Sequence, residues 1–235
     1  MDTVPNYLDW AFIAVTFTAA ALFRWVLLRG NSERGFKYTL IFLAGTVCWL
    51  SLQAGLAHFG VYTNHLDVLP PRIALLGLIP ALLFVISLLT LSATKLFRDH
   101  LPLREMTLVH TLRVPVELVL YGLFVAGTIP EVITFAGRNF DILAGLSAPL
   151  IFWYGFRPRA RKSLLIAWNV LGILLLLSVV IHALLAAPFP LQQIAFDQPN
   201  VAVLYFPYVW LPTYVVPLVL FCHLATLRKL FSQKP

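Results

Sequence analysis

The sequence predicts an all-α membrane protein, a single domain over residues 1–235 built as a bundle of seven transmembrane helices. Three observations predict it: 60% of the residues are apolar or aromatic, only 11% are charged, and the mean hydropathy is +0.86. An average soluble domain is about one quarter charged. The composition therefore excludes a soluble enzyme, a nucleic-acid-binding domain and a disordered chain.

Apolar stretches of membrane-crossing length recur along the whole chain. A helix needs about 20 mostly apolar residues to cross about 30 Å of hydrocarbon. The predicted spans are Tyr7–Arg29, Phe36–Gly60, Arg72–Leu96, Arg104–Gly127, Phe140–Phe156, Ser163–Ala186 and Asn200–Leu230. The first span follows acidic residues rather than a basic leader, so we expect it to stay as a helix rather than be removed as a signal peptide.

The charged residues predict the orientation of the bundle. Fourteen of the seventeen basic residues fall on one side of the predicted spans: Arg24, Arg29, Arg34, Lys37, Lys95, Arg98, Arg104, Arg157, Arg159, Arg161, Lys162, Arg228, Lys229 and Lys234. Six acids fall on the other side: Asp2, Asp9, Asp67, Glu131, Asp141 and Asp197. Basic loops stay in the cytoplasm. We therefore expect a multi-pass protein of the inner (cytoplasmic) membrane, with its N-terminus outside, its C-terminus inside and its basic side against anionic lipid headgroups.

The fourth span carries the most informative polar residues. His110, Arg113, Glu117 and Tyr121 are spaced three, four and four residues apart, so they share one helical face. A lone ionised group in mid-bilayer is expensive, and the two charged residues are one turn apart, so they are expected to offset each other. Pro115 lies between them and is expected to kink the helix. The face is interpreted either as a polar site or proton relay, or as a structural pair that fixes helix packing.

A second polar cluster is expected at the outer end of the bundle. His58 and His182 close the second and sixth spans, and Asn139, Asp141 and Glu131 should lie at the same level. Imidazoles and carboxylates together suit a divalent metal such as zinc, with His58, His182 and Asp141 as the candidate ligands. The alternative is two interfacial histidines bonded to neighbours or to lipid headgroups.

The seventh span is rich in proline and aromatic residues. Pro207, Pro212 and Pro217 recur at five-residue intervals and must disturb the helical ladder. Among them, Tyr205 and Trp210 could face a ligand, because broken helices that line a cavity are typical of transporters. They could equally form an interfacial aromatic belt. His223, further along, is interpreted as a packed histidine rather than a ligand.

The two ends of the chain resemble each other. Spans one to three and spans five to seven share residues at their ends and similar lengths, with span four as an inverting linker. This 3+1+3 plan is similar in topology to the SWEET sugar transporters and the KDEL receptor, although the Pro-Gln signature of that group is replaced by Gln198-Pro199. The runs Gly137–Asp141 and Phe196–Asn200 resemble an uncharacterised family of bacterial seven-span proteins, which implies no particular activity.

Three functions remain open on these residues. A small-molecule transporter or permease is favoured by the repeat, the proline-rich seventh span and the charged pair in span four, with Glu117 as the critical residue. An intramembrane lipid-processing metalloenzyme is the alternative, and a seven-helix receptor or binding protein is the third. The sequence does not determine whether the protein is an enzyme. It also leaves open the substrate, the coupling ion and the oligomeric state.

Overall fold

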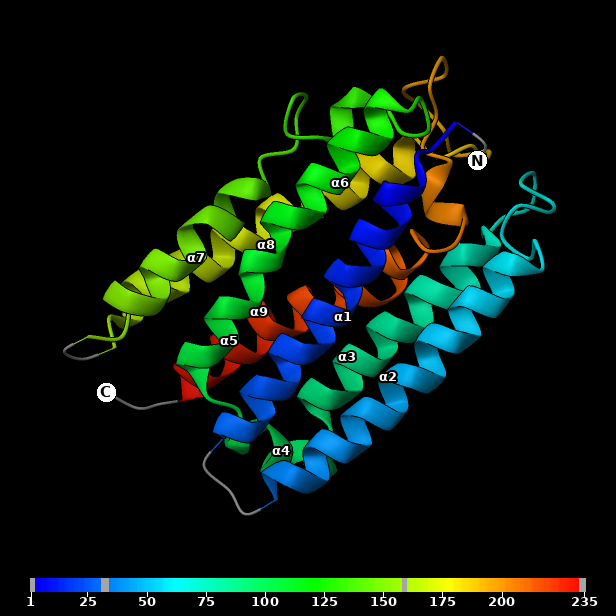
Figure 1. Ribbon diagram of the computed structural model, residues 1–235. Coiled ribbons are helices and arrows are strands. Elements are labelled where there is room, and N and C mark those ends of the chain that lie inside the picture. Colours follow the sequence, from blue (N-terminus) through cyan, green and yellow to red (C-terminus); the bar gives the residue numbers. More distant parts are fainter. Residues whose placement is uncertain (1–2, 31–33, 158–159, 233–235) are drawn as a thin grey trace.

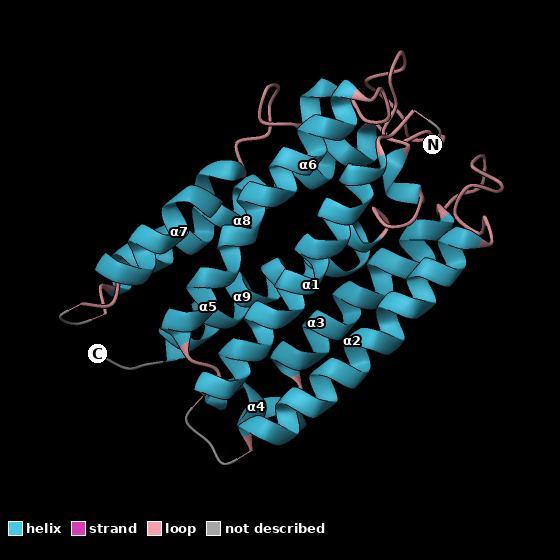
Figure 2. Cartoon of the chain, viewed as in Figure 1, coloured by secondary structure: helices cyan, strands magenta, loops and turns pink. Residues whose placement is uncertain are grey.

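The computed structural model describes residues 3–30, 34–157 and 160–232 of the chain. Within these ranges the chain forms helices and loops and no strand. The long helices run alongside one another, and the two termini lie at opposite ends of the bundle (Figures 1 and 2). Asp2, Arg159 and Lys234, which contributed to the charge argument, lie outside the described residues.

Short helical segments interrupt or flank several of the long helices. The α-helices are α1 Asn6–Arg29, α2 Gly35–His58, α3 Ile79–Thr90, α4 Lys95–His100, α5 Leu103–Val109, α6 Arg113–Val125, α7 Ile142–Tyr154, α8 Lys162–Leu185 and α9 Val216–Ser232. Two π-helices, η1 Ala74–Leu78 and η6 Leu211–Val215, precede α3 and α9. Short 3-10 segments occupy η2 Ser92–Thr94, η3 His110–Leu112, η4 Glu131–Ile133 and η5 Ala202–Leu204.

The structure is that of a helical membrane protein. Five described segments are long and apolar enough to cross a membrane: Asn6–Arg29, Gly35–His58, Leu103–Val125, Lys162–Leu185 and Leu211–Ser232. They correspond to the first, second, fourth, sixth and seventh predicted spans. The prediction that proline disturbs the seventh span is confirmed, because its helix starts only at Leu211 and opens with a π-helix.

The third predicted span is bent. Segments Ala74–Thr90 and Ser92–His100 meet at an angle of 75°. Leu91 is extended at the break, and the Arg98 guanidinium donates to the carbonyl oxygens of Leu88 and Leu91 at 3.1 and 2.7 Å. The arginine thus satisfies the acceptors that a continuing helix would have used. The span predicted to reach Leu96 therefore ends at Thr90.

The fifth predicted span is shorter than expected. Helix α7 has 13 residues, so it extends about 20 Å, against about 30 Å of hydrocarbon. The rest of this passage is the loop that precedes α7, which carries Asn139 and Asp141 into the bundle. In place of the continuous helix Phe140–Phe156, the structure has a short helix preceded by a polar loop.

The inner helices of the bundle are α9, α5–α6 and α1. In the most apolar stretch of each of these spans, 56%, 50% and 44% of the residues are buried. Helix α2 buries only 22% and α8 only 28%, so these two lie at the periphery. Aromatic pairs join α1 to the last span and to the loop before it: Phe23 lies 5.9 Å from Phe221, centroid to centroid, and Phe12 lies 5.4 Å from Tyr208. The core is therefore centred on α1, α6 and α9.

We predict that Gly77, where the two π-helices touch, tolerates no side chain. A Cβ there would lie 2.5 Å from Cγ2 of Thr213, whose hydroxyl is held by the carbonyl of Val209 at 2.7 Å. Gly77→Ala should therefore destabilise the fold by about 1–3 kcal/mol through overpacking. The matched control is Gly45→Ala on α2, where nothing lies within 4 Å of the new Cβ. Thermal unfolding in one detergent compares them, and equal melting temperatures would contradict the prediction.

Candidate functional site

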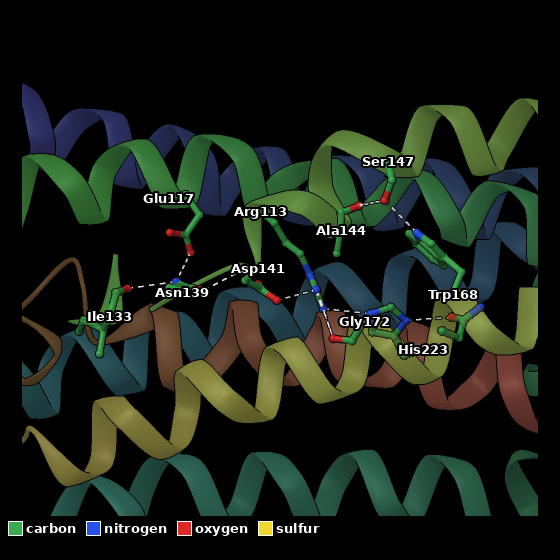
Figure 3. Close-up of polar contacts among 11 residues, drawn as sticks. Arg113, Glu117, Ile133, Asn139, Asp141, Ala144, Ser147, Trp168, Gly172 and His223 are labelled. Carbon is green, nitrogen blue, oxygen red and sulfur yellow. Dashed lines mark hydrogen bonds and ion pairs between the residues drawn. The ribbon is translucent and has the colours of Figure 1, made fainter. Parts of the chain in front are cut away.

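Arg113, the first residue of α6, is the centre of a buried polar network (Figure 3). It lies near the middle of the span Leu103–Val125, and only 3% of it is exposed. Its Nη1 donates to Oδ1 of Asp141 at 2.6 Å, and both Nη atoms lie 3.3 Å from the carbonyl oxygen of Gly172. Its Nη2 donates to Nε2 of His223 at 2.9 Å. One guanidinium therefore joins α6, the start of α7, α8 and α9.

Asp141 reaches Arg113 because the loop before α7 folds back into the bundle. Helix α6 ends at Val125, and the chain turns at Gly127, whose φ of +77° is the left-handed conformation that favours glycine. The side-chain amide of Asn139 then fixes the returning loop. Its Nδ2 donates to the carbonyl of Ile133 at 3.0 Å, and its Oδ1 accepts the backbone N–H of Asp141 at 2.9 Å.

The start of α7 can approach α6 closely because residue 145 is glycine. A Cβ at Gly145 would lie 3.0 Å from the backbone nitrogen of Val114 and 3.1 Å from Cβ of Arg113. The N-terminal turn of α7 is therefore packed directly against the turn of α6 that carries the arginine. This close packing lets Asp141, which directly precedes α7, lie next to Arg113.

Glu117 belongs to the same network but does not pair with Arg113. Its Oε1 accepts a hydrogen bond of 2.5 Å from Nδ2 of Asn139, and the residue is 2% exposed. The sequence-based expectation that Arg113 and Glu117 form the charged pair is corrected here, because the arginine partner is Asp141. Spacing along one helix identified two neighbours on a face, but the returning loop supplies the closer carboxylate.

The hydrogen bonds of His223 assign its tautomer. A guanidinium can only donate, so Nε2 of His223 accepts from Arg113 and Nδ1 carries the ring proton. That Nδ1–H donates to Oδ1 of Asn169 at 2.8 Å, and Nδ2 of Asn169 donates to the carbonyl of Leu165 at 2.8 Å. His223 is therefore a neutral imidazole in this arrangement, fixed on both sides.

His110 extends the network toward the basic end of the bundle. Its ring stacks on His223 with centroids 3.8 Å apart, and it meets the Trp168 ring edge-on at 5.2 Å. The indole N–H of Trp168 donates to Oγ of Ser147 at 2.9 Å, which ties α8 to α7. His110 is 1% exposed, and its Nδ1 has no hydrogen-bond partner among the described residues.

The other predicted cavity residues lie outside this network. Tyr121 is 39% exposed and stacks on Phe135 with centroids 5.0 Å apart. Trp210 is buried, but its indole N–H donates to the carbonyl of Leu50 on α2 at 2.9 Å. Tyr205 is partly exposed in the loop before η6. The structure therefore brings together His110, Arg113, Glu117, Asn139 and Asp141, and it uses the aromatic residues elsewhere.

The three candidate metal ligands do not come together. His58 is exposed at the end of α2, and Nδ1 of His182 lies 2.7 Å from the carbonyl oxygen of Ser178 on its own helix. Asp141, expected near them at the outer end, is instead held by Arg113 inside the bundle. Across residues 3–30, 34–157 and 160–232, no group of three or more His, Cys, Asp or Glu is placed to hold a metal ion.

The loop before η6 packs over the end of the bundle at which α1 begins. The hydroxyl of Tyr208 donates to Oδ1 of Asp9 on α1 at 2.7 Å. Burial raises the pKa of Tyr208, and the neighbouring Asp9 raises it further. The side-chain amide of Gln198 donates to the carbonyls of Phe124 and Ile129 at 2.9 and 2.5 Å, which covers the end of α6. These contacts hold the loop across the bundle.

Residues 70–231 match a protein family described as a domain of unknown function (DUF8737). The chain belongs to this family. The matched segment includes Arg113, Asp141 and His223 and leaves out α1 and α2. No curated protein and no solved structure matches the chain.

We predict that Asp141, rather than Glu117, is energetically coupled to Arg113. Asp141→Leu should cost about 3–5 kcal/mol of stability, because it leaves a buried arginine without its counter-ion. Combining Asp141→Leu with Arg113→Met should restore much of that loss. A parallel cycle with Glu117→Gln and Arg113→Met should give the smaller coupling energy. Unfolding midpoints of the six proteins test this, and a larger Arg113–Glu117 coupling would contradict it.

Proposed function

We propose that this protein is a proton-coupled permease for a small anionic solute. The observation that carries the proposal is a single buried arginine that shares one hydrogen-bonded network with two buried carboxyl groups, near the middle of a membrane span. Intramembrane ionisable residues of this kind mark substrate pathways and proton relays. Arg113 is the proposed anion-binding residue, Glu117 the proton-binding residue, and Asp141 the counter-ion that the solute displaces.

The charge balance of the network leads to proton coupling. Arg113 and Asp141 neutralise each other at 2.6 Å, whereas Glu117 is hydrogen-bonded to a neutral amide. An uncompensated charge in mid-bilayer costs at least about 2.5 kcal/mol, so we infer that Glu117 carries a proton while the site is empty. A monoanion that binds Arg113 would add one negative charge. To restore neutrality, Glu117 passes its proton to Asp141 as that acid leaves the arginine, and Glu117 then takes up a second proton.

The donors of Arg113 suit a carboxylate or a similar planar anion. Its Nη atoms are engaged by Asp141, Gly172 and His223, but its Nε has no hydrogen-bond partner among the described residues. A guanidinium fork binds planar oxyanions through two parallel hydrogen bonds. The amino end of α7 lies beside the same arginine, and a short helix that starts inside the membrane favours a negative group at that end.

The proposal includes seven crossings, with the N-terminus outside and the C-terminus in the cytoplasm. Helix α7 and the loop before it are taken as the fifth crossing, and the bent pair α3–α4 as the third. The end of the bundle assigned to the cytoplasm carries arginines over aromatic rings: Arg29 over Trp25, Arg104 over Phe152 and Arg157 over Trp153, at 5.7, 4.2 and 4.5 Å. Such pairs suit an interface with anionic headgroups in an inner membrane.

Labelling of single cysteines tests the orientation. Asp67→Cys and Ser232→Cys place exposed thiols at opposite ends, in a background that lacks Cys48 and Cys222. A membrane-impermeant maleimide should label the thiol at position 67 in intact cells and the thiol at position 232 only after permeabilisation. The reverse pattern would overturn the orientation. Labelling of both in intact cells would overturn the odd number of crossings.

Transport is tested with the purified protein in proteoliposomes. A panel of small radiolabelled monocarboxylates is compared with their neutral amides, with and without an inward proton gradient. At least one monocarboxylate should accumulate only when the gradient is present, and the amides should not accumulate. Glu117→Gln should abolish this uptake without unfolding the protein, because glutamine keeps the shape but cannot pass a proton to Asp141. The matched control is Glu131→Gln, an exposed glutamate in the outer loop, which should transport normally.

An infrared measurement tests directly whether Glu117 is protonated, and it needs no substrate. The wild-type protein in lipid at neutral pH should show the carbonyl absorption of a protonated carboxyl group. That band should be missing from Glu117→Gln and present in Glu131→Gln. A band that persists in the Glu117 variant would refute the assignment of the proton, and full gradient-driven uptake by that variant would refute the coupling.

A further inference from the structure

The helices α3 and α9 are broken in the same way. Each follows a five-residue π-helix, and each has a proline as its second residue, Pro80 in α3 and Pro217 in α9. The flanking sequence repeats with identical spacing: Pro70, Pro80, Leu83 and Phe84 in the first copy, and Pro207, Pro217, Leu220 and Phe221 in the second. This match in both sequence and local structure identifies the two segments as equivalent parts of the fold.

Each proline leaves a backbone carbonyl without its helical donor. A proline has no N–H, so Pro80 cannot bond the carbonyl of Leu76, and Pro217 cannot bond that of Thr213. In a membrane such an acceptor needs another donor, because lipid offers none. Both of these carbonyls are in fact hydrogen-bonded by side chains from a third helix.

Helix α2 provides both donors. Nε2 of Gln53 donates to the carbonyl of Leu76 at 3.1 Å, and Nε1 of Trp49 donates to the carbonyl of Thr213 at 2.9 Å. The two side chains are one helical turn apart, so they lie on the same face of α2. A helix that is otherwise peripheral therefore holds the proline break of both equivalent segments.

The two latches are supported by contacts around them. Gln53 is fully buried, and its Oε1 accepts a 2.6 Å hydrogen bond from the hydroxyl of Tyr62. Burial raises the pKa of Tyr62 to about 12, so this hydroxyl stays a donor at any ordinary pH. Gly77 in the first π-helix lies against Thr213 in the second, which brings the two breaks together. The breaks thus form one joint rather than two separate defects.

We propose that Trp49 and Gln53 are paired latches that fix the angles at which α9 and α3 leave their π-helices. The two proline breaks are the flexible points of these helices, because helices bend at π-helical segments and where backbone hydrogen bonds are missing. His223 lies on α9 just beyond the joint, so release of the Trp49 latch moves the imidazole that Arg113 binds. This last link, from joint to transport, rests on the proposed function.

Three variants separate a latch from ordinary packing. Trp49→Phe and Gln53→Leu remove one donor each and keep most of the side-chain volume. Trp153→Phe is the matched control, because Trp153 is an exposed tryptophan at the end of α7 and holds no broken helix. Each latch variant should alter the position of its own helix only, α9 for Trp49 and α3 for Gln53, and the control should alter neither.

Spin-label distances in lipid nanodiscs measure these positions. Labels at Ser232 on α9 and at Phe84 on α3 are each paired with a reference label at Leu150 on α7, in a background without Cys48 and Cys222. Trp49→Phe should shift or broaden the α9 distances and leave the α3 distances as in the parent. Gln53→Leu should do the opposite.

Two results would overturn the proposal that Trp49 and Gln53 act as latches. One is a lower melting temperature for both variants with parental distances in both pairs, which is the behaviour of residues that only stabilise packing. The other is an equal shift in both pairs from either variant, which is general loosening of the bundle. The distances do not depend on uptake. Helix-specific shifts in a protein that transports nothing would therefore support the latches and contradict the proposed permease.

Discussion

The ion pair between Arg113 and Asp141 is the interaction on which the interior of this bundle depends. An arginine that starts a helix near the middle of a membrane span must find a carboxylate at the same depth, since the lipid cannot solvate it. The chain meets this need by bringing a polar loop back from the end of α6. Helix α7 is short for that reason: its first turn has to begin where Asp141 meets the arginine. Gly145 completes the arrangement by letting the two backbones approach.

The same constraint explains the joint on the other side of the core. In both places a polar group inside the membrane lacks its usual partner, a counter-ion for Arg113 and an amide donor for the carbonyls of Leu76 and Thr213. In both places a distant segment supplies the partner. The difference lies in the kind of bond. The guanidinium holds four elements through charge, whereas each latch is a single neutral hydrogen bond. The joint is therefore the weaker of the two, and movement would begin there.

Hydropathy was enough to predict the helical membrane fold, because length and apolar composition decide which segments can cross a membrane. It could not predict the break at Leu91, which depends on where the Arg98 side chain reaches. Helical spacing grouped His110, Arg113 and Glu117, which are buried in the network, together with Tyr121, which is 39% exposed and lies outside it. It could not reveal that Asp141 lies at their depth, because that depth is set by the bonds of Asn139 to the returning loop. His223 was interpreted as packing for the same reason, since its partners lie on two other helices. The topological similarity to the SWEET transporters stays a prediction.

The network and the joint also limit each other. The hydrogen bonds of Arg113 reach three other elements, so α9 cannot tilt at its π-helix while the guanidinium still holds His223. Conversely, Arg113 cannot turn toward a solute without giving up Asp141 or His223, and either loss leaves a buried group unpaired. A proton on Asp141 and an anion on Arg113 remove that penalty together, because the arginine keeps a counter-ion and the acid becomes neutral. In the proposed permease, a site filled by only one of the two would carry an unbalanced charge through the membrane. Strict coupling of proton to anion thus follows from electrostatics, without a separate gate.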